Sequence, residues 1–391
     1  MAKRISSRLR RTLLFPWGVP MPEEVRKLDR RRVIKAGLGA FAFAMLGCGV
    51  LPAPSLASSL ESAKELYVGK FGGLAMGTVI NAQLYADSEQ TATDLIDEFE
   101  NLLEHYETAF TVHREGPLQN VNRNAGHWVS VDCEIEELVE RAQRLARESH
   151  GAFEPTIGPL VNVWKIGFGG QARPAQRDID AALRYVDYTR VEVDRTPGAC
   201  RVKIGPGQSL DLGAIAKGWI GSELVRKMRS LHCVCGMIDL GGNVALLGQS
   251  PSGRDWRVGI QRPDAERGEP FAVVNVSDVS VITSGNYERN IQAEGKRYGH
   301  ILNAVTGEPA PDDIGSVTIV DADGAKADGW CTALFAMGRK KALAFLLGRP
   351  DIQAVVVDNE LKTVWVSQGL AKHFELIDHS MELRIISNAL F

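Results

Sequence analysis

Apolar residues recur every three or four positions in several stretches of the chain, the spacing that places them on one face of a helix. The pattern is clearest in residues 90–110, where the apolar positions are Leu95, Ile96, Phe99, Leu102, Leu103 and Tyr106. Weaker versions of the same spacing predict further helices over residues 134–149, 177–185, 213–229 and 326–347. These amphipathic segments are expected to flank a sheet.

Shorter apolar runs bounded by turn residues predict the strands of that sheet. Two strands are expected within residues 67–85, around Gly72-Gly73, and a terminal hairpin around Asp358-Asn359. Further strand-like runs, including the two arms of that hairpin, cover residues 237–247, 256–260, 271–276, 279–283, 354–357 and 363–366. Because the strands are rich in hairpins, the pattern favours an α+β fold with largely antiparallel sheets over a doubly wound parallel sheet.

Composition changes this picture little, but it argues against some functions. The chain has 391 residues, of which 45% are hydrophobic and 24% charged, as is ordinary for a soluble globular protein. The net charge of −3 argues against a nucleic-acid-binding protein, which would carry a strong basic excess. The six cysteines form no paired CxxC set, so no zinc framework is visible.

Residues 1–57 have the pattern of a twin-arginine export signal and its flank. Arg30 and Arg31 stand in a basic segment, and the apolar run over residues 36–50 is too short to span a bilayer comfortably. Since the twin-arginine route carries folded proteins, we expect a periplasmic protein that has no stable transmembrane span once the signal is cleaved. The alternative is a membrane anchor that stays attached.

Cleavage at Ser55-Leu56-Ala57 would leave residues 58–391 as the mature domain. A second alternative is a lipoprotein anchored through Cys48, although Met45 is a poor first residue for that motif. If Cys48 is removed with the signal, an odd number of cysteines remains, so at least one is unpaired or buried. We interpret Cys233-Val234-Cys235 as part of a buried strand and not as a redox pair.

Two segments carry candidate chemistry. The first runs from Leu210 to Gly218 and places Asp211, glycines and Lys217 around a predicted helix start. Free N–H groups at a helix N-terminus favour anions, and a lysine adds a full charge, so this segment suits a pyrophosphate. It is not a P-loop, because the glycine-to-lysine spacing of that motif is absent.

The second segment places Asp328 and Thr332 four residues apart, and therefore on one face of a helix. A carboxylate and a hydroxyl are oxygen ligands of the kind that magnesium prefers, with substrate phosphates completing its coordination. The alternative is that Asp328 caps the helix N-terminus and binds no metal.

Read in order, the motifs resemble those of the ApbE family of FAD:protein FMN transferases. The resemblance covers roughly residues 74–338 and depends on the order of the motifs more than on any one of them. The matching segments are Ala75-Met76-Gly77-Thr78, residues 151–160, residues 210–218, Asp239-Leu240-Gly241-Gly242-Asn243, residues 256–260, residues 283–289, His300-Ile301-Leu302-Asn303 and residues 327–332.

The resemblance implies an ApbE-like (T-fold-like) architecture and a role for each matching position. The positions that match FAD contacts are Met76, Ala152, Phe153, Glu154, Asp211, Lys217 and His300. The positions that match a magnesium site are Ala214 through its carbonyl, Asp328 and Thr332. His300 and Asp328 are the implied catalytic residues, with His300 chosen as the general base.

Three positions depart from the family pattern. Glu154 stands where aspartate is usual, Asn303 replaces a carboxylate, and Val305 replaces a basic residue. If Asn303 or Val305 occupies a position that steadies the phosphate or the acceptor, catalysis is expected to be slower than in relatives. The alternative is that both are structural residues of the loop leading to Thr306-Gly307.

The implied reaction is magnesium-dependent cleavage of FAD, with FMN joined through a phosphoester to a Thr or Ser of a partner protein and AMP released. The expected partner is a flavoprotein subunit of a membrane redox complex, for which nitrous oxide reduction is one candidate. Two rival functions stay open. One is an FAD pyrophosphatase in which water replaces the acceptor, and the other is a non-catalytic flavin-binding assembly factor.

Tryptophans and the remaining histidines receive structural interpretations. Trp164, Trp219 and Trp256 are expected to pack in the core instead of stacking on flavin. The histidines outside the motifs, including His113, are expected to be surface or structural residues.

Overall fold

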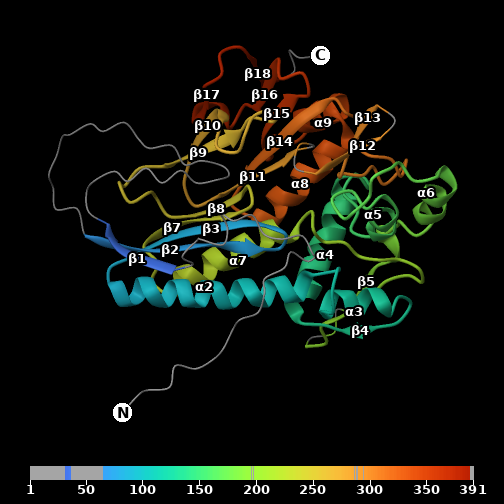
Figure 1. Cartoon of the computed structure of the whole chain (residues 1–391), viewed down its shortest axis with the longest axis horizontal. Helices are drawn as coiled ribbons and strands as arrows, with labels where there is room; N and C mark the ends of the chain where they lie inside the picture. The colour runs from blue at the N-terminus through green and yellow to red at the C-terminus, as the bar shows by residue number, and fades with distance from the viewer. Residues whose placement is uncertain are drawn as a thin grey trace.

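The computed structural model describes residues 31–36 and 65–387, apart from positions 195, 197, 286, 288 and 294. Its centre is a ten-stranded sheet, in the order β1 (Arg31–Ala36), β2 (Leu66–Ala75), β3 (Thr78–Ala86), β7 (Cys235–Leu240), β8 (Asn243–Leu247), β11 (Ser280–Gly285), β14 (Ile314–Asp321), β15 (Gln353–Asp358), β16 (Thr363–Ser367) and β18 (Glu382–Ile386). All neighbouring strands are antiparallel except β16 and β18, which confirms the predicted α+β fold (Figure 1).

Helices cover one face of this sheet. Since successive strand residues point to opposite faces, every second residue of a strand points toward these helices. The helices on that face are α2 (Glu89–Phe110), α7 (Ala216–Ser230) and α8 (Gly324–Met337), with α4 (Cys133–Glu148) and α9 (Arg339–Leu347) packed against α8. In β7, Ile238 and Leu240 join the core on this face, whereas Cys235 and Met237 join the core on the other. The sheet therefore separates two hydrophobic cores.

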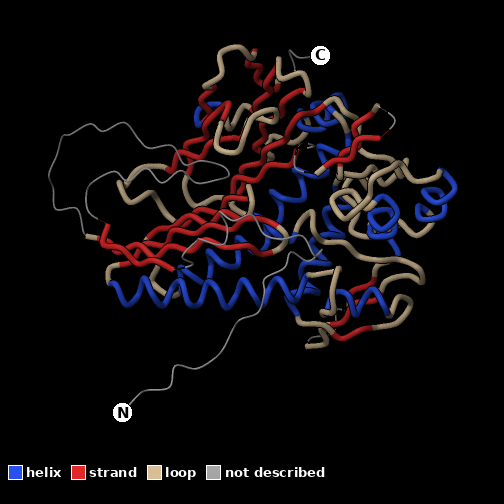
Figure 2. Tube along the Cα trace, viewed as in Figure 1, coloured by secondary structure: helices blue, strands red, loops and turns tan. Residues whose placement is uncertain are grey.

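The second face is covered by a smaller three-stranded sheet of β9 (Trp256–Gln261), β10 (Pro270–Val276) and β17 (Phe374–Leu376). Most of the remaining elements lie at the end of the molecule where Figure 1 labels α5 and α6, and Figure 2 shows in the same view that they are short helices and strands joined by loops. The remaining elements are α3 (Pro117–Arg123), β4 (Val129–Ser130), α5 (Gly158–Trp164), α6 (Gln176–Leu183), η1 (Tyr188–Arg190), β5 (Glu192–Val193), β6 (Arg201–Lys203), β12 (Asn290–Ala293), β13 (Lys296–Gly299) and η2 (Ala371–His373). Among the described residues, no helix has the length and apolar character needed to cross a membrane.

Several predicted boundaries need correction, and glycines explain two of them. The turn between β2 and β3 lies at Met76-Gly77, where both residues have positive φ, and Gly72-Gly73 lies inside β2. The stretch predicted as one helix over 326–347 breaks at Gly338, whose φ of 75° cannot continue a helix. Residues 237–247 form two strands, and α7 begins at Ala216, three residues later than predicted.

The strand β1 lies inside the predicted export signal. Residues 31–36 pair antiparallel with β2, so in the full-length chain they form an edge of the main sheet. Cleavage after Ala57 would remove this strand and leave β2 at the edge. Arg30, the apolar run beyond residue 36, Cys48 and the cleavage site all lie outside the described residues.

A disulfide joins Cys133, the first residue of α4, to Cys200 before β6. Cys233, Cys235 and Cys331 are free and buried. Burial raises the pKa of Cys233 to about 11 and, together with neighbouring Cys233, that of Cys235 to about 12. These values agree with the interpretation of the two residues as small apolar side chains.

Replacing Cys133 and Cys200 by serine is expected to lower the free energy of unfolding by about 2–4 kcal/mol, because the disulfide closes a long loop in the unfolded chain. The two cysteines are 67 residues apart. Denaturant unfolding of the double variant, compared with wild type before and after reduction, measures the effect. Equal stability of the oxidised and reduced wild type would contradict the prediction.

Candidate active site

Several of the motifs meet at one end of the main sheet. The β2–β3 turn at Met76-Gly77 lies beside the β7–β8 turn, where a Cβ on Gly241 would overlap the side chain of Thr78. Next in the sheet, β11 pairs with β8 and continues past it to Gly285. The order of strands therefore gathers motifs that are far apart in the sequence.

Two helices cross closely above this end of the sheet. A Cβ on Gly218 of α7 would overlap the carbonyl of Gly324 of α8, so only glycine permits this approach. The crossing places Asp328 against the first turn of α7, where its Oδ2 accepts a hydrogen bond of 2.9 Å from the Gly218 N–H. Asp328 is 3% exposed. The pyrophosphate segment and the cation segment are thus in direct contact.

This hydrogen bond takes the Gly218 N–H away from the carbonyl of Ala214. In a regular first turn, the Gly218 N–H would donate to the carbonyl four residues earlier, which is that of Ala214. Here it donates to Asp328 instead, and no other backbone N–H of the described residues bonds to Ala214. The carbonyl, the Asp328 carboxylate and the Thr332 hydroxyl one turn along α8 provide the oxygen ligands that magnesium prefers.

Asp328 does not cap its helix. The N-cap of α8 is Asp323, whose side chain accepts from the Lys326 N–H, whereas Asp328 accepts from an N–H in the first turn of α7. Within the described residues, no three His, Cys, Asp or Glu side chains are grouped for metal binding. A cation at Asp328 would therefore depend on the Ala214 carbonyl and on oxygens of a substrate.

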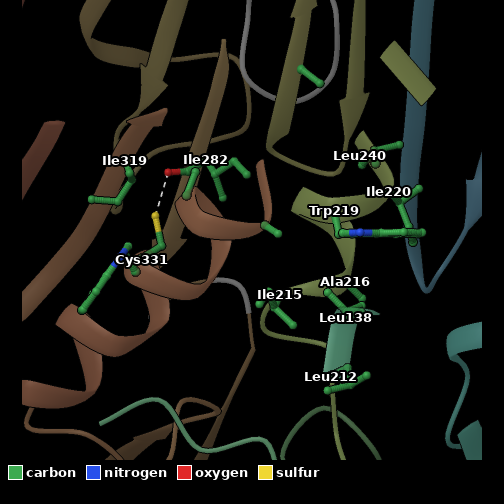
Figure 3. Packing of buried hydrophobic residues seen from close by; sticks show 14 of the residues in the cluster. Leu138, Leu212, Ile215, Ala216, Trp219, Ile220, Leu240, Ile282, Ile319 and Cys331 are labelled. Atoms are coloured by element: carbon green, nitrogen blue, oxygen red, sulfur yellow. Dashed lines mark hydrogen bonds between the residues drawn. The ribbon is translucent and has the colours of Figure 1, made fainter. Parts of the chain in front are cut away.

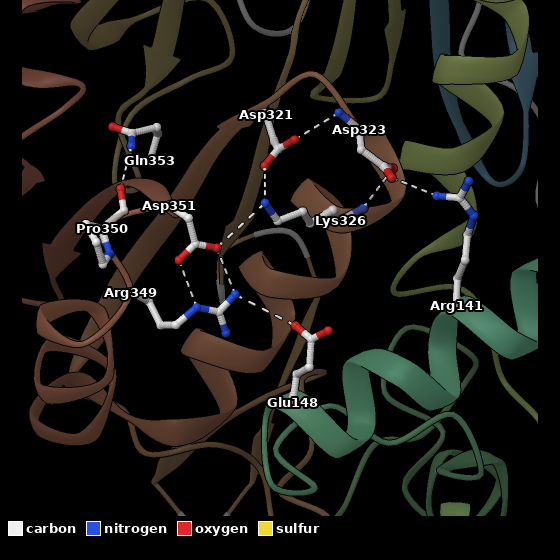
Figure 4. A network of polar contacts seen from close by, with 9 residues as sticks. All are labelled: Arg141, Glu148, Asp321, Asp323, Lys326, Arg349, Pro350, Asp351 and Gln353. Carbon is white, nitrogen blue, oxygen red and sulfur yellow. Dashed lines mark hydrogen bonds and ion pairs between the residues drawn. The ribbon is translucent and has the colours of Figure 1, made fainter.

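A network of ion pairs fixes the orientation of α8, and with it Asp328 (Figure 4). Arg141 of α4 donates to Asp323 over 2.7 Å. Arg349, whose guanidinium lies over the ring of Trp330 in α8, is 3.7 Å from Glu148 of the same helix α4. Underneath, the Cys331 thiol donates to the carbonyl of Ile282 in β11 over 2.9 Å (Figure 3). Helix α8 is held from both sides.

Two cationic side chains, Lys217 and Arg289, act on His300. Lys217 lies in the first turn of α7, with its Nζ 3.3 Å from the Gly213 carbonyl. Burial, together with the cations of Arg289 and Lys217, lowers the pKa of His300 to about 4. His300 is therefore a neutral base at neutral pH.

Arg289 was not among the predicted site residues. Its guanidinium lies over the ring of Phe168, 5.3 Å from the centroid. The sequence offered only one signal for it, its place at the end of the motif over residues 283–289. Its position beside His300 depends on the hairpin of β12 and β13, which no apolar periodicity predicted.

A cavity of about 230 Å³ opens next to this cluster and is lined by His113, Asn122, Asn162 and Asp211, among others. The His113 ring lies 4.4 Å from that of Phe168, centroid to centroid. Burial lowers the pKa of His113, and Asp211 opposes that shift. His113, interpreted from sequence as surface or structural, thus lines a cavity at the site.

The segment from Ala152 to Glu154 reaches the site through the backbone. Pro155 accepts a hydrogen bond of 2.9 Å from the Asp211 N–H, which ties this segment to the pyrophosphate segment. Phe153 is only 2% exposed and packs in the core. The Glu154 carboxylate joins its own loop to η1, because one oxygen accepts from Thr156 and the other from the Tyr188 N–H. Burial raises the pKa of Glu154.

Met76 occupies a conformation that is rare for a side chain of its kind. Its φ is 51°, and its N–H donates to Glu107 over 3.2 Å. Gly77 follows with Arg289 nearby. The predicted tryptophans are core residues, as expected: Trp164, Trp219 and Trp256 are all buried, and Trp164 donates to the carbonyl of Gly307.

Asn303 and Val305 have structural positions. The Asn303 Oδ1 accepts from the Val305 and Thr306 N–H groups, and its Nδ2 donates to the Ala336 carbonyl at the end of α8. Val305 is 77% exposed. The structure thus favours the alternative in which both residues shape the loop.

Comparison with known proteins agrees with this geometry. The ApbE family profile matches residues 76–356. A Klebsiella pneumoniae protein named FAD:protein FMN transferase is 36% identical over 293 residues, covering 74% of this chain and 89% of the relative. A Treponema pallidum protein of the same name is 33% identical, covering 78% and 88%.

Solved structures show the same architecture. The crystal structure of the ApbE protein from Thermotoga maritima matches with a TM-score of 0.71 at 27% identity, over 78% of this chain and 99% of that one. The apo flavinyl transferase ApbE from Pseudomonas stutzeri matches with a TM-score of 0.65, also at 27% identity, over 74% and 91%. In its profile, its relatives and its architecture, this chain belongs to the ApbE family.

Proposed function

We propose that this chain is an FAD:protein FMN transferase that acts on Thr or Ser side chains of partner flavoproteins. The observation that carries the proposal is the contact between Asp328 and the first turn of α7, which takes the Gly218 N–H away from the Ala214 carbonyl beside Lys217. Family membership supplies the reaction class, because the relatives bear that name.

The residues of the chain divide the work between binding and proton transfer. The N-terminal turn of α7 and Lys217 bind the pyrophosphate of FAD. His300, neutral at pH 7, accepts the proton of the acceptor hydroxyl as its oxygen attacks the FMN phosphorus. The P–O bond to AMP breaks and AMP leaves. Magnesium, when held by Ala214, Asp328 and Thr332, offsets the charge on the pyrophosphate.

Incubating the protein with FAD, magnesium and a candidate acceptor tests the proposal. The expected product is a protein band that stays fluorescent on a denaturing gel. Release of FMN and AMP at a useful rate without any acceptor would favour the FAD pyrophosphatase. Tight FAD binding with no turnover under any condition would favour the assembly factor.

The double variant Asn303→Asp with Val305→Arg is expected to leave the transfer rate within about twofold of wild type, although an acid–base role would carry about 10²–10⁴-fold. Asn303→Asp alone removes the donor to Ala336 and is expected to lower stability by about 1–2 kcal/mol. Single-turnover transfer and denaturant unfolding of each variant measure the two effects. A large rise in the transfer rate of the double variant would show that these two positions take part in catalysis.

We propose further that the protein is exported by the twin-arginine route and works in the periplasm. The paired arginines at 30 and 31 support this location, and the Cys133–Cys200 disulfide suits an oxidising compartment. Replacing Arg30 and Arg31 by lysine is expected to keep the precursor in the cytoplasm. Immunoblots of periplasmic and cytoplasmic fractions measure it, and normal periplasmic accumulation would contradict the route.

The acceptor is proposed to be a flavoprotein subunit of a membrane redox complex, with nitrous oxide reduction as the finer candidate. The support is the family together with the export signal. Membranes of cells with and without this protein can be compared for fluorescent bands after denaturing electrophoresis. A flavinylated band that depends on this protein identifies the acceptor, and unchanged bands would contradict the proposal.

A further inference from the structure

The backbone of Arg289 contacts the imidazole of His300 directly. The Arg289 carbonyl accepts a hydrogen bond of 3.1 Å from the backbone N–H of His300. The same carbonyl oxygen lies 3.2 Å from Nδ1 of the His300 ring. A carbonyl oxygen can only accept, so the Nδ1 that bonds to it must carry the ring proton. In the neutral ring, the lone pair is then on Nε2, and Nε2 is the nitrogen available to take a proton.

The side chain of Arg289 is held on both sides. Its guanidinium lies 5.3 Å from the centroid of the Phe168 ring. A Cβ on Gly167 would come within 2.7 Å of the Arg289 Cδ, so the loop before Phe168 packs closely on the arginine stem. On the other side, the guanidinium lies 3.5 Å from the position of a Cβ on Gly77. The side chain therefore joins two loops across the site.

The side-chain contacts of Arg289 add to the backbone contacts that hold its carbonyl in place. Arg289 directly precedes β12, and the hydrogen bond from the backbone N–H of His300 to its carbonyl continues the β12–β13 hairpin by one position. Stacking on Phe168 and packing against Gly167 anchor the residue whose carbonyl contacts His300. A shift of that carbonyl would free the imidazole to exchange tautomers.

We propose that Arg289 is a positioning residue for His300: its side chain, anchored on Phe168, holds its carbonyl where it selects the Nδ1–H tautomer and leaves Nε2 as the base. The tautomer is a property of the folded chain alone, whereas its use in catalysis rests on the proposed transferase function. The test therefore has one part that needs no FAD and one part that does.

The first part measures the His300 tautomer by ¹⁵N NMR of the full chain labelled at histidine, with the His300 signal assigned by its loss in His300→Gln. Wild type is expected to show a protonated Nδ1 and an unprotonated Nε2. Arg289→Ala, and independently Phe168→Leu, are expected to show a mixture of tautomers. An Nε2–H form in wild type, or an unchanged Nδ1–H form in both folded variants, would overturn the proposal.

The second part measures single-turnover FMN transfer. Arg289→Ala is expected to lower the rate by about 10–100-fold, the usual effect of removing a group that orients a functional histidine. The KM for FAD should change less than the rate, and Arg289→Lys should restore only part of it because it keeps the charge but not the planar stack. The exposed Arg177→Ala is the matched control and should match wild type.

The two parts separate the possible failures. Correct tautomers with no transfer to any acceptor, in wild type as in the variants, would remove the transferase function and leave the positioning role of Arg289 standing. Transfer in wild type that is unaffected by Arg289→Ala would overturn the catalytic part of the proposal, whatever the tautomer.

Discussion

Replacing Asp328 by asparagine is expected to lower FMN transfer by roughly 10³-fold, since the substitution removes the only acidic group proposed to hold the cation. Asparagine keeps an oxygen that can accept from the Gly218 N–H, so the crossing of α7 and α8 should survive. Alanine would leave that buried N–H without a partner, which costs about 1–3 kcal/mol of stability. The asparagine variant is thus the cleaner test of charge.

The measurement is single-turnover transfer as a function of magnesium concentration. Thr332→Ala is the matched control on the same helix face, one turn away. Because water can replace a neutral hydroxyl ligand, Thr332→Ala should lose little activity and recover it at high magnesium, whereas Asp328→Asn should not recover. Wild-type transfer by Asp328→Asn at limiting magnesium would show that the proposed cation site is wrong.

The sequence predicts the residues of this site because each motif is a short continuous segment that contains its own functional side chains. Lys217 and Asp328 each belong to a motif that the sequence predicts, and the two motifs meet where the Gly218 N–H donates to Asp328. What the sequence could not indicate was the contact itself, because it depends on Gly218 and Gly324 meeting across two helices. A glycine within a helical pattern indicates only a less favourable helix position, and it does not indicate which other helix will pack against it.

Other differences also arise from tertiary contacts. Glu154 matches a flavin-binding position, and its carboxylate joins its own loop, through Thr156, to η1, through Tyr188. Asn303 stands where the family has a carboxylate. In the structure its side-chain amide donates to the Ala336 carbonyl and so connects its loop to the end of α8. Helix α2 was predicted well because its apolar spacing is local, whereas the turn at Met76-Gly77 needed a positive φ that methionine rarely adopts.

Replacing His300 by glutamine is expected to lower transfer by about 10²–10⁴-fold, the usual contribution of a general base, with FAD affinity changed much less. Glutamine can still donate a hydrogen bond toward the Arg289 carbonyl but cannot accept a proton in the reaction. The exposed His379→Gln is the control and should match wild type. Added imidazole should partly rescue His300→Ala, in which the ring has been removed. A fully active His300→Gln would exclude His300 as the base.

The pH dependence gives this prediction a second, independent measurement. His300 has its pKa lowered to about 4, because it is buried and faces the cations of Arg289 and Lys217. A base works only when it is deprotonated, so its contribution should be complete at pH 5 and above and should fall as the pH drops through 4. An ordinary histidine would instead lose activity below its pKa of about 6.5. The transfer rate of wild type should therefore stay constant from pH 5 to 8, and circular dichroism should show that the chain is folded over this range. The fall in rate near pH 4 should be absent from the residual activity of His300→Gln. A limb near pH 6.5 in wild type would mean that the catalytic imidazole is more exposed to water than His300 is in this structure.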